Sequence, residues 1–364
     1  MTDAQIAIAG VVPRRVVTPR DVDELRALLV ELNAARAAFA FVGGGTELEL
    51  GNAPRALDTV VRTNALRRVV DYAPEDQTIT VEAGITFAEL DAVLAEHGQM
   101  LPLDVLDRTR ATVGGALATN AYGARRQRYG TAKDLIVGVR VVRPDGTPAR
   151  GGGKVVKNVA GFDLPKLAVG SLGTLFGIVE ATLRVYPVPA ARTTLTYALP
   201  ARETIAAASR AFTAQRLEPE TFVVHDGRTL TVEMAGTAAG VAEQCAAADA
   251  ALRALGATPA EPPAVDAQPR AWRARAVTPP SRTPAGEITF PLLGVALRAS
   301  DEPFDLAAMR RAASAVVVHA LPPSARAQVD VWGPPPPSFP LMQALKANFD
   351  PRGLCNPGRF VGGL

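Results

Sequence analysis

The sequence predicts an α+β protein with more than one lobe. The chain has 364 residues, of which 48% are hydrophobic, so it can form one large core or two ordinary ones. Strand and helix patterns alternate along it, and Pro187-Val188-Pro189 interrupts them, since proline cannot continue a strand ladder. We therefore expect a first domain over residues 1–190, a smaller α+β domain over 191–335, and a terminal segment, 336–364, that packs back on the first domain.

Composition excludes several classes of protein. No run of 18 apolar residues predicts a transmembrane helix, and the N-terminal residues do not resemble a secretory signal. Two distant cysteines, Cys245 and Cys355, form neither a metal site nor a disulfide framework, as expected in the cytoplasm. No spaced histidine or cysteine lies beside either cysteine, so we expect no bound metal. The net charge of +3 arises in an arginine-rich chain without a long basic face, so we expect no nucleic-acid partner.

In the first domain, Thr18-Pro19 predicts the start of a helix, because a hydroxyl cap precedes a proline at the first helical position. Thr86 and Glu89 have capping-box spacing for a second helix, which ends at His97-Gly98. Apolar and β-branched runs predict the strands, at residues 38–42, 56–61, 77–82, 135–142 and 177–186.

The second domain repeats strand and helix patterns. Residues 193–199 predict a strand, 203–215 a helix, and 222–234 a hairpin that turns at Asp226-Gly227. An alanine-rich helix then runs to Leu255. After a linker at 258–269, further elements are expected: strands at 287–297, 315–320 and 327–332 and a helix at 306–315. This order suggests an antiparallel sheet with helices on one face.

Three glycine-rich elements carry the functional prediction. Gly43-Gly44-Gly45-Thr46 follows a strand, and glycine lets successive N–H groups converge on a phosphate, although a tight turn between strands would explain the same residues. The run lacks G-x-G-x-x-G spacing and is not a dinucleotide fingerprint. The second element is Thr112–Gly123, whose small side chains suggest a bare backbone against a flat or charged group. The third joins Lys157–Leu164 to Gly170–Gly177.

These elements, in this order, resemble the PCMH-type FAD-binding domain of vanillyl-alcohol oxidase and its relatives, over about residues 10–190. The terminal Phe349–Arg359 looks like that family's closing segment, which returns beside the flavin. Within the family, Lys157–Asp163 and Trp272-Arg-Ala-Arg275 are most similar to the FAD-binding subunits of bacterial glycolate oxidases. The resemblance implies FAD as cofactor and oxidation of small 2-hydroxy acids as the process served.

The resemblance also implies site residues. Gly43, Gly44, Gly45 and Thr46 would meet the FAD pyrophosphate. The second element would line the same ligand with backbone and hydroxyl donors, through Thr112, Val113, Gly114, Gly115, Thr119 and Gly123. Gly177, Ile178 and Val179 would pass the adenine or ribose end. Asn356 would lie beside the isoalloxazine, or else form only an Asn-Pro turn.

Two departures from the family define the expected role. Thr46 stands where covalent relatives have a histidine bonded to the flavin, so we expect non-covalent FAD. The histidine-rich stretch that supplies metal ligands and a base in the catalytic relatives is missing. His97, His225 and His319 each stand alone, so no catalytic residue is assigned. Arg125, Arg126 and Arg128 form a solvated rim, an anion contact on FAD, or a docking patch for an acidic partner.

Three hypotheses follow. The first is an FAD-binding subunit of a glycolate oxidase complex, with a second, catalytic flavoprotein subunit and an iron–sulfur subunit as partners. That complex would be cytoplasmic, or peripheral at the inner face of the membrane through those partners. Two cysteines cannot hold an iron–sulfur cluster in this chain. The second is a self-sufficient FAD-dependent oxidoreductase acting on another hydroxy acid or alcohol. The third is a nucleotide-binding scaffold without redox function.

Overall fold

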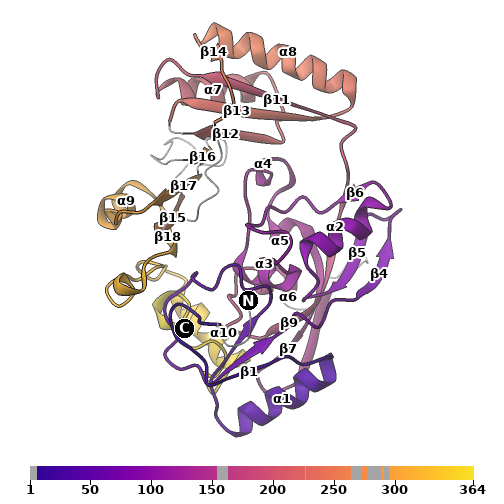
Figure 1. Cartoon of the computed structure of the whole chain (residues 1–364), viewed down its shortest axis with the longest axis vertical. Helices are drawn as coiled ribbons and strands as arrows, with labels where there is room; N and C mark the ends of the chain where they lie inside the picture. The colour runs from indigo at the N-terminus through magenta and orange to yellow at the C-terminus, as the bar shows by residue number, and fades with distance from the viewer. Residues whose placement is uncertain (1–5, 154–162, 226, 264–271, 278–287, 291–294) are drawn as a thin grey trace. The chain divides into compact units, whose positions relative to one another are not determined.

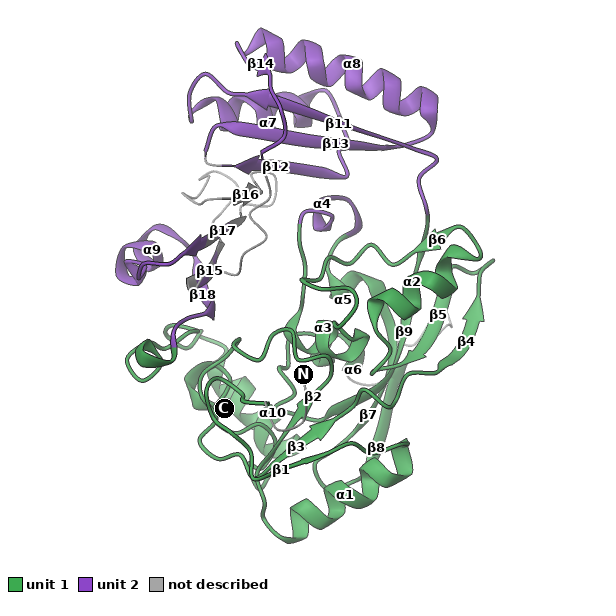
Figure 2. Cartoon of the chain, in the orientation of Figure 1, with its two compact units in different colours: residues 1–123, 130–187, 323–364 green, residues 124–129, 188–322 purple. Residues whose placement is uncertain are grey.

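The computed structural model describes residues 6–153, 163–225, 227–263, 272–277, 288–290 and 295–364. These residues divide into two compact units (Figures 1 and 2). Unit 1 comprises residues 1–123, 130–187 and 323–364, and unit 2 comprises residues 124–129 and 188–322. The expected α+β fold, with a smaller antiparallel-sheet domain and a C-terminal segment that returns, is confirmed.

Unit 1 contains two main sheets. A parallel sheet has the order β1-β3-β2, with β1 at Arg15–Val17, β3 at Thr59–Arg62 and β2 at Phe39–Val42. Helix α1, Val22–Ala34, packs its leucine stripe in the same core as β2 and β3. The predicted helix start at Thr18-Pro19 is wrong. The helix begins at Val22 because the Asp21 carboxylate caps it, accepting the Glu24 N–H at 2.8 Å.

The second sheet of unit 1 is antiparallel, with the order β4-β5-β9-β7-β8. These strands span Val69–Ala73, Thr78–Glu82, Gly177–Arg184, Ile136–Val142 and Pro148–Gly152. Four helices share its core: α2 at Phe87–Ala95, α3 at Val113–Thr119, α5 at Ala132–Leu135 and α6 at Leu164–Ala168. A short pair, β6 at Gln99–Met100 and β10 at Tyr186–Pro187, lies outside this sheet.

The C-terminal part of unit 1 begins with the turn η3, Pro323–Ala325. It continues through α10, Phe339–Phe349, to η4, Val361–Gly363. The predicted strand at 327–332 is absent from the described chain. The Asn52 side chain accepts the Val331 N–H at 3.1 Å, and the Trp332 indole N–H donates to the Arg359 carbonyl at 2.8 Å. These contacts take the place of a strand ladder.

Unit 2 is built on one sheet with the order β14-β11-β13-β12-β16-β17-β15-β18. Its strands are β11 at Ala191–Ala198, β12 at Thr221–His225, β13 at Thr229–Gly236, β14 at Thr258–Pro259, β15 at Trp272–Val277, β16 at Ile288–Phe290, β17 at Val295–Ser300 and β18 at Ala315–Ala320. The single strand predicted at 287–297 is therefore two strands. The predicted hairpin at 222–234 is present as β12 and β13.

Helices complete unit 2. Helices α7, Thr204–Ala214, and α8, Ala238–Ala254, pack in one core with β11, β12 and β13. Helix α9, Leu306–Ala312, packs on β18. A short helix, α4 at Arg126–Tyr129, also belongs to this unit, although residues on both sides of it belong to unit 1. The Arg125 guanidinium lies 3.6 Å from the buried Glu220 carboxylate.

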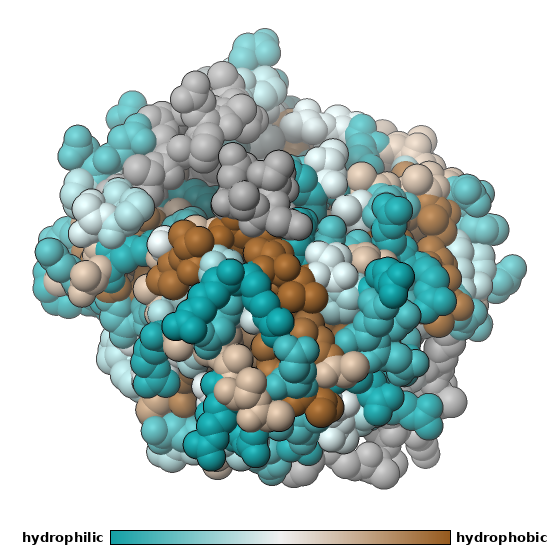
Figure 3. Space-filling model, turned by 60° about the horizontal axis from the view of Figure 1, so that its bottom comes forward, coloured by the Kyte–Doolittle hydropathy of each residue, from teal (hydrophilic) through white to brown (hydrophobic). Residues whose placement is uncertain are grey.

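One face of the molecule is drawn in Figure 3. In the view of Figure 3, hydrophilic residues cover most of the face and hydrophobic residues gather near its middle. Large apolar side chains that are well exposed, such as Val12, Val30 and Leu341, come from separate elements. No helix among the described residues is long and apolar enough to cross a membrane.

Candidate functional site

The loop Gly43–Thr46 follows β2 and packs directly against the segment before α3. A Cβ on Gly44 would lie 1.6 Å from the Arg110 carbonyl oxygen, and one on Gly43 would lie 2.0 Å from Oγ1 of Thr112. Any side chain at these positions would collide with the neighbouring segment. The two glycines are therefore required by the close approach of two protein backbones, in addition to any ligand contact.

This loop also offers hydrogen-bond donors. Within the described part of the chain, no acceptor takes the backbone N–H groups of Gly43, Gly44, Gly45 or Thr46. Gly45 has a φ of +69°, a conformation that turns successive N–H groups toward one point. Consecutive donors of this kind favour an anion such as a pyrophosphate.

Helix α3 contributes shape more than donors. The N–H groups of Val113 and Gly114 donate to the carbonyls of Ile85 and Ala83, at 3.0 and 2.7 Å. The Gly115 N–H donates to the capping Thr112 hydroxyl, and the Thr119 hydroxyl bonds back to the Gly115 carbonyl. The bare backbone expected over residues 112–123 is thus largely a capped helix whose small residues face a cavity.

The C-terminal segment reaches the same cavity through Asn356. This residue is 5% exposed, and its backbone N–H donates to the Phe39 carbonyl at 2.6 Å. Its Nδ2 donates to the Leu172 carbonyl at 2.6 Å, whereas its Oδ1 is buried without a partner among the described residues. Asn356 therefore presents a free amide oxygen in the cavity wall.

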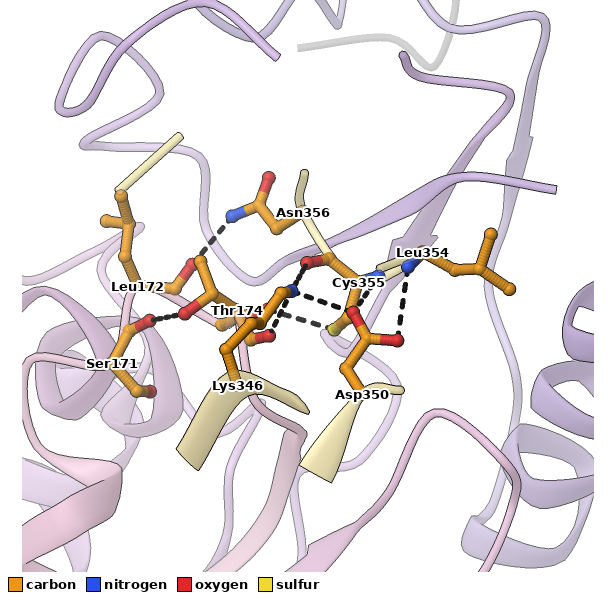
Figure 4. Close-up of polar contacts among 9 residues, drawn as sticks. Ser171, Leu172, Thr174, Lys346, Asp350, Leu354, Cys355 and Asn356 are labelled. Atoms are coloured by element: carbon orange, nitrogen blue, oxygen red, sulfur yellow. Dashed lines mark hydrogen bonds and ion pairs between the residues drawn. The ribbon is translucent and has the colours of Figure 1, made fainter. Parts of the chain in front are cut away.

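A buried ion pair fixes the position of Asn356 (Figure 4). The Lys346 ammonium is 2.7 Å from Asp350 Oδ2 and donates to the carbonyls of Thr174 and Cys355. Asp350 in turn accepts the N–H groups of Leu354 and Cys355 at 3.1 and 2.8 Å. Through Lys346, helix α10 is hydrogen-bonded both to the loop at Thr174 and to Cys355, the residue before Asn356. Burial raises the pKa of the Cys355 thiol well above its usual range, so this thiol stays protonated.

Arg359 is the basic residue of the described cavity wall. It is 3% exposed, and its guanidinium donates to the carbonyls of Leu48, Leu50 and Asn52. Burial, together with the neighbouring charge of Arg326, lowers its pKa to about 9, so it remains charged at neutral pH. The guanidinium holds the chain that follows the glycine loop and supplies positive charge beside it.

The cavity is lined mainly by four segments that are distant in sequence, residues 41–48, 105–121, 172–178 and 356–359. Most of the predicted site residues lie on its wall: Gly43, Gly44, Gly45, Thr46, Thr112, Gly114, Gly115, Thr119, Ile178 and Asn356. Four others do not line it. Val113 and Val179 are buried in the cores, Gly177 lies against the Phe41 ring, and Gly123 lies against the Asp104 carboxylate. Lys157–Phe162 of the third element lies outside the described residues.

Sequence reasoning did not single out Glu47 or Arg359 as site residues. They are the one acidic and the one basic side chain among the described residues of the cavity wall. Their positions in the sequence could have indicated them, because Glu47 follows the glycine loop directly and Arg359 ends the closing segment. None of the three histidines lines the cavity as described: His97 stacks edge-on with Tyr72, His225 lies on β12 and His319 on β18.

Comparison with protein-family models explains this site. Residues 13–152 match the FAD binding domain, and residues 335–360 match the C-terminal domain of FAD linked oxidases. The expected resemblance to FAD-binding flavoproteins is therefore confirmed. The site's residues fit FAD, since the N–H groups of the glycine loop have no backbone acceptor and would bind the pyrophosphate, while small side chains on α3 leave room for a flat group. When bound, FAD supplies a hydride and electron acceptor.

Several relatives of this chain are named for hydroxy acids. It is 34% identical over 207 residues to D-2-hydroxyglutarate dehydrogenase of Xanthomonas citri, covering 57% of this chain and 44% of that protein. It is 32% identical to glycolate oxidase subunit GlcD of Bacillus subtilis, covering 60% and 47%. It is 34% identical to subunit GlcE of Escherichia coli, covering 48% and 51%. The chain thus spans about half the length of these relatives.

A solved structure agrees at the level of fold. Alkyldihydroxyacetonephosphate synthase superposes with a TM-score of 0.67 over 94% of this chain and 75% of that one. The sequence identity is 16%, so the likeness concerns the fold alone. It supports the fold class expected from the sequence.

Proposed function

We propose that this chain is the FAD-binding subunit of a glycolate oxidase complex, which oxidises a small 2-hydroxy acid. It binds FAD non-covalently and relays electrons for, or otherwise supports, a second, catalytic flavoprotein subunit. An iron–sulfur subunit is the third partner. The complex works in the cytoplasm, either free or attached by its partners to the inner face of the membrane.

The observation that carries this proposal is the composition of the cavity wall. Oxidation of a 2-hydroxy acid requires a base for the hydroxyl proton and a cation for the carboxylate. The described wall holds no histidine, its one carboxylate is that of Glu47, and the described residues hold no cluster of metal ligands. Its single cation, Arg359, already donates to three backbone carbonyls. The residues serve to bind and orient FAD, and they leave substrate chemistry to a partner.

Threonine at position 46 supports the non-covalent mode. It lies on the cavity wall at the end of the glycine loop, and its hydroxyl has no basic nitrogen with which to bond a flavin carbon. The N–H groups of the loop and the Asn356 amide provide hydrogen bonds in place of a covalent link. The similarity to both GlcD and GlcE subunits supports the assignment to a complex.

The test compares the isolated chain with the reconstituted complex. Anaerobic stopped flow of the FAD-loaded chain with glycolate or D-lactate should show negligible flavin reduction, whereas the complex should turn over. His319→Ala should leave that turnover within a few-fold of wild type, because His319 is outside the described cavity wall. Rapid bleaching of the isolated chain's flavin by either acid would overturn the proposal.

A second candidate is a self-sufficient FAD-dependent oxidoreductase acting on another hydroxy acid or alcohol. One observation favours it: the Glu47 carboxylate lies on the cavity wall and is a general base by residue type. If the isolated chain reduces its flavin with a hydroxy acid and Glu47→Gln abolishes that reduction, this candidate replaces the first.

A further inference from the structure

A second pocket lies in unit 1, separate from the FAD cavity. Its volume is about 220 Å³, and none of its lining residues lines the FAD cavity. Its apolar wall comes from α6, from the segment that follows it, from α10 and from the C-terminal turn, through Leu167, Val169, Leu175, Met342, Leu345 and Phe360. Its polar side chains are those of three lysines, Ser171 and Thr174, and Gly170 and Leu364 complete the lining.

Three of the chain's few lysines line this pocket, although arginine is far more common than lysine in the sequence. The sequence has 39 basic residues, of which only five are lysines, and Lys133, Lys166 and Lys346 all line this one pocket. Lysine presents a compact point charge, whereas arginine presents a planar fork. Lys346 is committed to Asp350 and two carbonyls, and Lys166 makes an exposed ion pair with Asp163 at 3.0 Å. Such an exposed pair is weak, so Lys166 is available together with Lys133.

Ser171 supplies an independent indication of a ligand. The residue is 6% exposed, and its Oγ is buried with no hydrogen-bond partner among the described residues. In Figure 4 this hydroxyl points away from Asn356. A buried hydroxyl without a partner costs free energy, and a bound acceptor would remove that cost. Between the two pockets lies a single stretch of chain, because Leu172 and Gly173 line the FAD cavity while Ser171 and Thr174 line this pocket.

We propose that this pocket is an effector site for a small aromatic carboxylate. A dry cavity of about 150 Å³ accommodates benzene, so this larger pocket has room for an aromatic ring with a carboxylate. The ring packs on the leucines and Phe360, and the carboxylate accepts from Ser171 and meets the ammonium groups of Lys133 and Lys166. The bound anion braces residues 171–174, to which Asn356 and Lys346 are hydrogen-bonded, and it therefore slows the loss of FAD.

The experiment uses the full chain loaded with FAD. Binding of 4-fluorobenzoate is followed by fluorine NMR, with 4-fluorobenzamide as the uncharged probe of the same shape. Wild type should bind the carboxylate saturably and at least ten-fold more tightly than the amide. The double variant Lys133→Gln/Lys166→Gln should weaken carboxylate binding at least ten-fold, Ser171→Ala several-fold, and Leu345→Trp should abolish it by filling the pocket. FAD should dissociate at least two-fold more slowly from wild type when the carboxylate is present.

Arg202→Gln, which removes an exposed arginine of unit 2, is the control and should bind like wild type. The lysine variant changes exposed or half-exposed side chains, so its folding and FAD content should be normal even if Leu345→Trp misfolds. Equal affinity for the two probes would overturn the proposal. So would carboxylate binding that survives both pocket variants and shifts the flavin absorption spectrum, because the anion would then occupy the FAD cavity. An FAD dissociation rate that the carboxylate leaves unchanged would refute the effector role.

Discussion

At the scale of single residues, the FAD site depends on positions where no side chain can be accommodated. Gly44 is the sharpest case, since the space for its Cβ is filled by a backbone carbonyl and not by a mobile side chain. A main-chain atom can move only if the whole loop moves. A change that displaces the loop therefore also displaces the backbone N–H groups that we expect to bind FAD.

Replacing Gly44 with alanine should remove most of the bound FAD. The added methyl would lie 1.6 Å from the Arg110 carbonyl oxygen and would push the loop away from α3. The ratio of flavin to protein absorbance after gel filtration measures the effect. Gly240→Ala in α8 is the control, because its new Cβ meets only the capping Thr237 hydroxyl at 3.1 Å, and its FAD content should be normal. Full flavin in Gly44→Ala would contradict the assignment of this loop.

The pair of Lys346 and Asp350 should be important for stability. Lys346→Met leaves a carboxylate that is 1% exposed without its cation, which should lower the free energy of unfolding by about 3–5 kcal/mol. Urea unfolding measures the loss. The exposed pair of Arg253 and Asp249 is the control, and Arg253→Met should cost at most about 1 kcal/mol. Similar losses in the two variants would show that the buried network does not hold the C-terminal segment.

At the scale of elements, the sequence predicted helices where local chemistry decides them. The capping box of Thr86 and Glu89 is present with both of its halves, and the leucine stripe of α1 is buried as expected. Local chemistry also explains the error at α1, because an aspartate nearer the helix competes successfully with Thr18. The prediction of a strand at 327–332 was wrong for a different reason. Polar groups of this segment are hydrogen-bonded to residues distant in sequence, Asn52 and Arg359. No pattern within the segment reveals such partners.

For the site, too, the sequence predicted the local patterns but not the contacts between distant segments. Glycines and hydroxyls near one another in sequence identified the loop and α3. The chain could not reveal that the first N–H groups of α3 are already bonded to Ile85 and Ala83, since these bonds depend on how α3 packs on the segment after β5. Nor could it reveal that Cys355, the residue before Asn356, is bonded to a lysine on α10, a helix that the sequence reasoning did not anticipate.

Strand β18 carries a histidine that should affect stability as a function of pH. Burial, together with the charges of Arg275 and Arg273 on β15, lowers the pKa of His319 to about 3, from 6.5. The unfolded chain therefore binds a proton between pH 6.5 and 3 that the folded chain does not. Stability from this residue is complete above pH 6.5 and falls by up to about 1.4 kcal/mol for each pH unit below it.

Urea unfolding of wild type and His319→Gln at pH 7.5, 6.0 and 5.0 tests this expectation. The variant should lose less stability than wild type over that range. Identical slopes would show that His319 is protonated in the folded protein. His97→Gln is the control, because His97 is exposed, and its slope should match wild type.

At the scale of the whole molecule, the attachment of FAD should be reversible. Acid precipitation or denaturation in SDS should release all the flavin to the supernatant, because Thr46 offers no nitrogen for a covalent bond. A flavin-fluorescent protein band on a denaturing gel, or an intact mass raised by that of FAD, would contradict the non-covalent mode. Boiled supernatant analysed by chromatography identifies the released cofactor as FAD.

The hydrogen bond from the Phe39 N–H to the Leu354 carbonyl has a consequence for synthesis in the cell. The strand beside the glycine loop is made early, but its partner leaves the ribosome only after all of unit 2 has been made. Until then the edge of β2 and the apolar side chains around it remain incomplete. The nascent chain is thus expected to need a chaperone on this edge, and to acquire FAD only after translation of the closing segment.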